Sequence, residues 1–205
     1  GRTIWTHSYD VVYPEYGADP DHPFGPVATP VVADGKVYTL GRMSHLVCLD
    51  ALTGRVLWSH NLPKEYQTTE DLRGPNCSPI VESNLVIIAI AKSPQISLVA
   101  FEKHSGRPVW EALDEIPSNS SPIVLDFAGR RQLVVWAYKS VAALDPATGR
   151  ILWRQDIPPG GNYAVPTPVW KDDLLLLSGL MMKLHRDQPG ASILWPEELR
   201  PARIY

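Results

Sequence analysis

The sequence predicts an all-β fold in which four-stranded antiparallel sheets pack radially, one after another along the chain. Three observations predict it: a regularly recurring tryptophan, a Thr-Pro or Ser-Pro dipeptide that keeps step with it, and short β-branched runs separated by turn residues. The recurring residues Trp5, Trp58, Trp110, Trp153 and Trp195 are separated by 53, 52, 43 and 42 residues. Sheets built by repeats of this length need a neighbour on each face, so we expect a radial arrangement.

Each repeat unit is expected to hold four consecutive strands. The first unit places Asp34-Gly35 between two apolar runs, and this dipeptide best favours a two-residue hairpin because both central residues need positive φ. Proline opens each unit because the first residue of a strand loses no ladder hydrogen bond. Four units follow a leading strand that ends at Trp5, and they cover residues 29–58, 78–110, 121–153 and 167–195.

The turn before the last strand of the first unit reads DALTG from Asp50 to Gly54, and related turns occur in the second and third units. The acidic side chain and the hydroxyl of such a turn bond nearby backbone amides, and glycine supplies the left-handed residue. The fourth unit departs from this pattern, since LHRDQPGASILW from Leu184 to Trp195 is one residue longer and lacks the aspartate at its place. We therefore expect structural turns in three units and a different turn in the fourth.

Composition and charge exclude several classes of function. At 44% hydrophobic and 20% charged residues, the 205-residue chain can bury a substantial core. Its 19 basic and 22 acidic residues give a net charge of -3 without a long like-charge run, so the basic surface of a nucleic-acid-binding protein is missing. No apolar run approaches the roughly 18 residues of a membrane-spanning helix. We expect neither a nucleic-acid partner nor a membrane span in this chain.

The repeat resembles the tryptophan-docking repeat of pyrroloquinoline quinone (PQQ)-like β-propellers, whose pattern is A-x-D-x-x-T-G-x-x-x-W. Residues 143–153 are similar to it at every named position, and residues 100–110 match with Glu102 for aspartate and Ser105 for threonine. In the first unit Cys48 takes the alanine place. The resemblance covers nearly the whole chain and implies a single propeller domain over residues 1–205, about half of a ring of seven or eight blades.

The resemblance leaves two classes of function open. The family contains quinoprotein alcohol dehydrogenases, which hold a quinone and a calcium ion in the central funnel and place adjacent cysteines against the quinone. It also contains BamB-like members that bind no cofactor. This chain has only Cys48 and Cys77, which are 29 residues apart. Buried structural thiols are favoured over a Cys48–Cys77 disulfide because the two positions fall in different blades. We expect no bound cofactor and no catalytic residue in this chain, while its enzymatic status stays open.

Loops that lead from one unit to the next should share one face near the central opening, where propellers commonly bind. Asp19, Asp21 and His22 are spaced loosely enough to ligate a cation, although a solvated loop without metal is the favoured interpretation. The loops that form this face are Thr6–Gly25, Ser59–Asn76 and Arg154–Pro166. The candidate ligand or partner residues are Tyr9, Tyr13, Tyr16, Asp19, Asp21, His22, Tyr66, Arg73, Asn76, Asn162 and Tyr163.

The favoured function is a non-catalytic binding or scaffolding module of the bacterial cell envelope that holds a protein or a small ligand on the loop face. The alternative is a fragment of a PQQ-dependent alcohol dehydrogenase of the polyvinyl-alcohol type. A periplasmic or envelope location is what the resemblance implies. Since Gly1 opens the chain within a repeat, we expect a partial propeller without its signal peptide.

Overall fold

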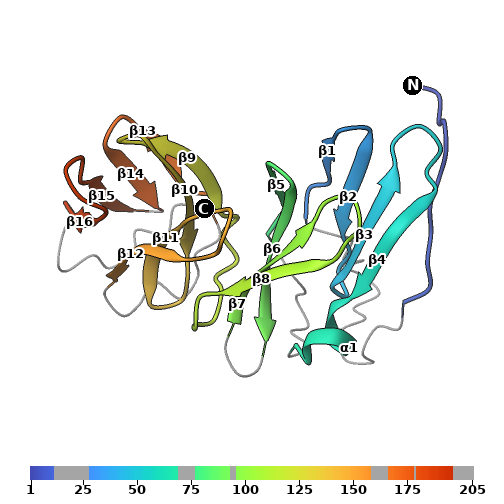
Figure 1. Ribbon diagram of the computed structural model, residues 1–205, viewed down its shortest axis with the longest axis horizontal. Helices are drawn as coiled ribbons and strands as arrows, with labels where there is room; N and C mark the ends of the chain where they lie inside the picture. Colours follow the sequence, from blue (N-terminus) through green and yellow to red (C-terminus); the bar gives the residue numbers. More distant parts are fainter. Residues whose placement is uncertain (12–27, 69–76, 93–95, 158–165, 178, 196–205) are drawn as a thin grey trace.

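The computed structural model describes residues 1–11, 28–68, 77–92, 96–157, 166–177 and 179–195. Its strands form four four-stranded antiparallel sheets, each built from strands that are consecutive in the chain. Figure 1 shows these sheets following one another along the long axis of the molecule. The predicted all-β fold of four-stranded antiparallel sheets is confirmed.

We number the sheets as blades 1 to 4 in chain order. Blade 1 contains β1 (Val31–Ala33), β2 (Lys36–Leu40), β3 (His45–Asp50) and β4 (Val56–Asn61). Blade 2 contains β5 (Ile80–Glu82), β6 (Leu85–Lys92), β7 (Ile96–Glu102) and β8 (Pro108–Ala112). Blade 3 contains β9 (Ile123–Phe127), β10 (Arg130–Trp136), β11 (Ser140–Leu144) and β12 (Ile151–Asp156). Blade 4 contains β13 (Val169–Lys171), β14 (Leu174–Leu177), β15 (Leu180–Leu184) and β16 (Ala191–Ile193).

The predicted hairpin at Asp34-Gly35 is confirmed. Ala33 pairs with Lys36, and the two residues between them have φ values of 47° and 69°. Both lie in the left-handed region that a type I′ turn requires. The sequence therefore specified this hairpin locally, without help from the rest of the fold.

The DALTG turn of blade 1 also has the predicted structure. The Asp50 carboxylate accepts the backbone amides of Leu52 and Thr53 at 3.1 and 2.8 Å and the Thr53 hydroxyl at 2.8 Å. Gly54 follows with φ of +72°, a conformation that costs glycine little and other residues more. These contacts fix the direction in which the chain enters β4.

One row of paired residues crosses each of the first three blades. In blade 1 the row runs through Val31, Tyr38, Cys48 and Trp58. A small residue always faces the tryptophan, and the strand register shifts directly after it in all three blades. The rows of blades 2 and 3 are Ile80, Ile87, Ala100 and Trp110, and Ile123, Val134, Ala143 and Trp153.

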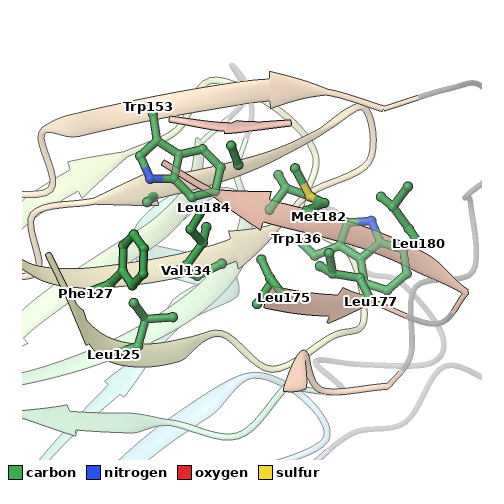
Figure 2. Packing of buried hydrophobic residues seen from close by; sticks show 13 residues of the cluster. Leu125, Phe127, Val134, Trp136, Trp153, Leu175, Leu177, Leu180, Met182 and Leu184 are labelled. Carbon is green, nitrogen blue, oxygen red and sulfur yellow. The ribbon is translucent and has the colours of Figure 1, made fainter. Parts of the chain in front are cut away.

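The hydrophobic core is divided into three layers, one at each junction between neighbouring blades. Trp58 belongs to the layer between blades 1 and 2, and Trp110 packs against the layer between blades 2 and 3. Figure 2 shows the third layer, where Trp153 of β12 lies beside Leu184 of β15. Burying a side chain of this size contributes about 1.5–3 kcal/mol, so these layers hold consecutive blades together.

Three tryptophan rings lie directly on a glycine of the following blade. A Cβ added to Gly54, Gly106 or Gly149 would lie 2.6, 2.8 or 2.7 Å from the rings of Trp5, Trp58 and Trp110 respectively. The indole nitrogens of Trp5 and Trp58 also donate to backbone carbonyls of these turns, those of Ala51 at 3.0 Å and Lys103 at 3.1 Å. The same turn residue thus serves the backbone geometry of its own blade and the contact with the preceding one.

Trp153 makes a different contact because blade 4 lacks the shared turn sequence. Its indole nitrogen donates to Gln132 Oε1 of its own blade at 2.8 Å. The glycine of the fourth turn, Gly190, lies instead against His185. The expected departure of the fourth turn is confirmed, and it changes how blades 3 and 4 meet.

Both cysteines are free thiols and both are buried. Cys48 lies in the layer between blades 1 and 2, whereas Cys77 lies in the layer between blades 2 and 3. Burial raises the pKa of each thiol to about 11. The expectation of a buried thiol at Cys48 is confirmed, and the disfavoured Cys48–Cys77 disulfide does not form. In the described ranges, no helix is long and apolar enough to cross a membrane.

Candidate binding face

The face predicted to bind ligands lies at the end of the sheets where the fourth strand of each blade finishes, which we call the loop end. Two of its candidate residues, Tyr9 and Tyr66, fall within the described ranges. The other nine lie outside the described residues: Tyr13, Tyr16, Asp19, Asp21, His22, Arg73, Asn76, Asn162 and Tyr163. For these nine, a role on this face stays a prediction.

Tyr9 takes part in an aromatic and amide cluster on blade 1. The segment that carries it runs down the flank of blade 1 beside β4 (Figure 1). Its ring centroid lies 5.3 Å from that of His45 and 5.9 Å from that of His7, and the residue is 41% exposed. Tyr9 is therefore partly exposed as a residue, while its ring contacts His7 and His45 and its hydroxyl lies against Gly41.

His45 is held as a neutral imidazole in this cluster. Asn61 Nδ2 lies 2.9 Å from His45 Nε2, and since an amide nitrogen can only donate, the ring nitrogen accepts. Burial lowers the pKa of His45, in agreement with a neutral ring. Its buried Nδ1 has no hydrogen-bond partner in the part of the chain that the structure describes. The cluster therefore holds the Tyr9 and His45 rings together on blade 1.

Tyr66 lies at the end of a short helix, whereas a loop was predicted from the sequence. Instead of a continuous loop after Ser59, β4 extends to Asn61 and a short helix, α1 (Leu62–Tyr66), follows. Asn61 caps this helix by accepting the Lys64 amide at 3.2 Å. The helical turn points Tyr66 inward, where it is 6% exposed and packs edge-on against Phe101 at 6.2 Å.

Burial raises the pKa of Tyr66 to about 12. A phenol so enclosed is part of the core between blades 1 and 2 and does not present its ring to a ligand. The sequence did carry a signal for this helix, since Asn61 followed by Leu62 and Pro63 is a favoured helix start.

His60 connects blade 1, helix α1 and blade 2. Its Nδ1 lies 2.6 Å from Glu65 Oε2, and its Nε2 lies 2.7 Å from the carbonyl oxygen of Gly106. The imidazole also stacks on Phe101 with centroids 4.5 Å apart. Both ring nitrogens are therefore engaged in contacts between elements.

Glu115, in the segment that joins blades 2 and 3, is a buried carboxylate of the loop end and is 4% exposed. Its Oε1 accepts the Ser140 hydroxyl and Arg154 Nη2, the latter at 2.6 Å, and its Oε2 accepts the Lys139 amide at 2.8 Å. Its backbone carbonyl accepts the hydroxyl of Ser97 from β7. Glu115 therefore anchors the segment between blades 2 and 3 to blade 3, because its carboxylate accepts hydrogen bonds from three residues of that blade.

The carboxylates of Asp50 and Glu102, in the described turns, likewise accept hydrogen bonds from nearby groups. Asp50 accepts the amides of its own turn, and Glu102 accepts Ser105 N at 2.6 Å and Asn84 Nδ2 at 2.8 Å. Among the described residues, no group of three or more histidine, cysteine or acidic side chains could hold a metal ion. The polar groups of the loop end instead support contacts between elements and between blades.

A family model described as outer membrane protein assembly factor BamB matches residues 1–180 of the chain. The chain belongs to this BamB-like family of PQQ-type repeat proteins. The structure agrees with the assignment, since BamB from Moraxella catarrhalis superposes with a TM-score of 0.59 at 18% identity, over 83% of this chain and 48% of that one.

Quinoprotein dehydrogenases share the same fold. The quinohemoprotein alcohol dehydrogenase of Comamonas testosteroni superposes with a TM-score of 0.57 at 17% identity, over 84% of this chain and 36% of that one. In sequence, the chain is 26% identical over 168 residues to quinoprotein alcohol dehydrogenase PedH of Pseudomonas putida, covering 74% of this chain and 25% of the relative. It is also 25% identical over 171 residues to quinoprotein ethanol dehydrogenase of Pseudomonas aeruginosa, covering 70% of this chain and 26% of the relative.

The chain therefore spans about a quarter of the length of these curated relatives and about half of the BamB chain.

Proposed function

We propose that the chain is a non-catalytic propeller module that binds a protein partner at its loop end in the bacterial cell envelope. The observation that supports it most is the use of the loop-end polar groups. His60, Glu115 and Arg154 all bond across element or blade boundaries, as structural anchors do. The rigid frame that results would present Tyr9 and the neighbouring loops to a partner.

The location and the kind of partner follow from the family. Its description names a factor of outer membrane protein assembly, so an envelope location and a protein partner suit a chain of this family. The net charge of -3 is consistent with a partner other than nucleic acid. A tyrosine that is part exposed and part held, like Tyr9, is a favoured residue of protein interfaces because its ring combines an apolar face with a polar tip.

A second candidate is a fragment of a PQQ-dependent alcohol dehydrogenase of the polyvinyl-alcohol type. The sequence similarity to quinoprotein alcohol and ethanol dehydrogenases favours it. Calcium requires several oxygen ligands at one point, and quinone-dependent oxidation requires a base near the substrate hydroxyl. In this chain the loop that carries Asp19 and Asp21, outside the described residues, is the candidate source of such ligands.

A titration tests whether this chain itself supplies a site for the quinone and calcium. The purified chain is titrated with PQQ and calcium while absorbance and dye-coupled alcohol oxidation are followed. The proposal expects neither saturable binding nor turnover. Micromolar binding or turnover that disappears in Asp19→Ala or Asp21→Ala would establish the dehydrogenase candidate instead.

A cross-linking experiment tests the binding role itself. A photoreactive amino acid replaces Tyr9 in one variant and Leu52 in the other, and both chains are exported to the periplasm of a bacterial host. Leu52 is exposed at the opposite end of blade 1 and serves as the matched control. The proposal expects a discrete protein adduct from position 9 alone. Equal labelling from both positions would contradict a specific loop-end partner.

A further inference from the structure

A groove lies between blades 2 and 3 at the end of the sheets opposite the loop end. It has a volume of about 440 Å³ and is formed by the β5–β6 hairpin tip at Glu82–Leu85, the β11–β12 turn at Asp145–Ala147, and Arg131 of β10. We call it the junction groove. No part of the proposed loop-end function uses it, so its role is a separate question.

The equivalent place between blades 1 and 2 is filled by a lysine of the chain itself. Lys103, directly after the acidic residue of the blade 2 turn, extends its ammonium group to Asp34 Oδ2 at 2.5 Å and to the Ser83 carbonyl oxygen at 2.6 Å. Its side chain is only 13% exposed. The molecule therefore shows which side chain fits between a hairpin tip and the turn of the next blade.

At the junction groove the corresponding turn residue is Pro146, which cannot extend across. The indole nitrogens of Trp5 and Trp58 donate to the carbonyl oxygen of this turn position in their junctions. In contrast, the buried indole nitrogen of Trp110 has no partner within the described ranges, although its ring lies on Gly149 of the same turn. Trp110 does not line the groove, but its unpartnered indole and the groove both distinguish this junction from the preceding one.

The chemistry of the junction groove favours a cation on an alkyl stem. Leu85, Pro146 and Ala147 supply apolar walls for methylene groups. The charged residues on its wall are two carboxylates, Glu82 and Asp145, and one guanidinium, which leaves one net negative charge.

The guanidinium of Arg131 already donates hydrogen bonds to two carboxylates. It bonds Glu82 through Nε at 3.0 Å and Nη2 at 2.7 Å, and Asp126 through Nη1 at 2.7 Å. By contrast, Asp145 uses its Oδ1 to accept a single backbone amide, that of Ala147 at 2.9 Å. Asp145 is thus the carboxylate best placed to receive an ammonium group.

We propose that the junction groove between blades 2 and 3 binds a lysine side chain presented by a partner polypeptide, in the way that Lys103 occupies the preceding junction. The alkyl stem lies against the apolar wall and the ammonium group pairs with Asp145. This site is distinct from the loop end and goes beyond the proposed function.

The first test measures binding to the full chain by following the Trp110 indole N–H in NMR spectra, with the signal assigned through Trp110→Phe. The probes are the capped tripeptide Ac-Gly-Lys-Gly-NH₂, the same peptide with norleucine for lysine, and butylamine. The lysine peptide is expected to shift the signal saturably with a Kd of about 1–10 mM, as suits a ligand of this size. Absence of saturation, or equal binding of the norleucine peptide, would overturn the proposal. Binding of butylamine with exclusion of the lysine peptide would overturn a polypeptide source.

The second test uses matched variants. Asp145→Asn keeps the acceptor for the Ala147 amide but removes the charge, and it should weaken the lysine peptide about fivefold or more. Asp50→Asn makes the same change in the blade 1 turn, far from the groove, and should leave the affinity unchanged. Equal effects of the two variants would contradict the assignment of Asp145.

The third test introduces a lysine into the chain itself, at the turn position next to the junction groove. Pro146→Lys should melt at a temperature at least about 2 °C above Pro146→Met, which has a stem of similar length without charge. Ala51→Lys places a lysine at the same turn position of blade 1, next to which the described residues of this chain form no preceding hairpin, and should show no gain over Ala51→Met. A Pro146→Lys variant no more stable than Pro146→Met would show that the groove does not accept an ammonium group.

Discussion

At the scale of single residues, the contact that joins two blades is a tryptophan ring on a glycine. Gly106 has φ of +74°, and a Cβ there would lie 2.8 Å from the Trp58 ring. Glycine is therefore required at this position for two reasons. The turn needs a residue with positive φ, and the Trp58 ring occupies the space where a side chain would lie. Asp50 and Glu102 fix such turns by accepting amides, which keeps the glycine in place beneath the ring.

A comparison of Gly106→Ala with Gly35→Ala separates the effect of positive φ from the effect of the clash with the ring. Gly106→Ala suffers both the positive φ and the clash with Trp58, whereas Gly35→Ala, at φ of +69°, has open space and suffers only the first. The strained backbone costs about 1–2 kcal/mol, and overpacking adds about 1–3 kcal/mol. Chemical denaturation should show Gly106→Ala to be less stable than Gly35→Ala by that second amount. Equal losses would mean that the ring adapts without cost.

Glu102 makes stability depend on acid pH. The Ser105 hydroxyl, together with the amides of Ser105 and His104 and the Asn84 side chain, lowers the pKa of Glu102 from 4.5 to about 2. Because the folded state prefers the ionised form, its contribution is present above pH 4.5 and is lost as the pH falls toward 2.

Melting temperatures measured between pH 7 and pH 2 test this. Glu102→Gln should be less stable than the parent chain at pH 7 and should approach it near pH 2. Ser105→Ala, which removes the largest cause of the shift, should give an intermediate profile. A constant difference across the whole range would assign the loss to packing and not to ionisation.

At the scale of elements, turns that depend only on neighbouring residues could be predicted from the sequence, whereas contacts between distant segments could not. The hairpin at Asp34-Gly35 and the DALTG turn form because neighbouring residues satisfy their own backbone. The bonds of Glu115 to Ser140 and Arg154 bring together residues from separate strands, and no spacing in the sequence marks them.

The burial of Tyr66, one candidate residue of the binding face, was not predicted for the same reason. Tyr66 was assigned to a loop because the segment after Ser59 lacks strand periodicity, but a capped helical turn buries it against Phe101. Tyr9 is partly exposed, and its tilted contact with His45 depends on how the first segment lies along blade 1, which no spacing in the sequence marks.

Trp153 tests the predicted packing role of the recurring tryptophans. It is buried between blades 3 and 4, and its indole bonds Gln132. Trp153→Ala should cost about 3–5 kcal/mol, the range for deleting a large buried aromatic side chain. Trp170→Ala serves as the control, because that ring is partly exposed at the edge of blade 4 and should cost much less. An unchanged denaturation midpoint for Trp153→Ala would refute the packing role.

At the scale of the whole molecule, consecutive blades cover one another, and the last described blade has an open face. Val169, Leu176 and Met181 form one paired row across blade 4, and Leu194 continues it through its bond to the Met181 carbonyl. The equivalent row of blade 3 is covered by blade 4. Within the described ranges no element covers the blade 4 row, where Val169 is 62% and Leu194 47% exposed.

An apolar row of this kind favours association, because each side chain removed from water stabilises the contact by about 25 cal/mol per Å² of buried apolar area. We therefore expect the isolated chain to self-associate as its concentration rises, detected by light scattering and sedimentation. The double variant Val169→Lys and Leu194→Lys places charges on the row and should shift the chain toward monomer. Leu52→Lys with Ile116→Lys adds the same charge at two exposed apolar residues away from this row and should not. If the parent chain is monodisperse and highly stable at all concentrations, or if both double variants reduce association equally, the blade 4 face is not the surface that drives it.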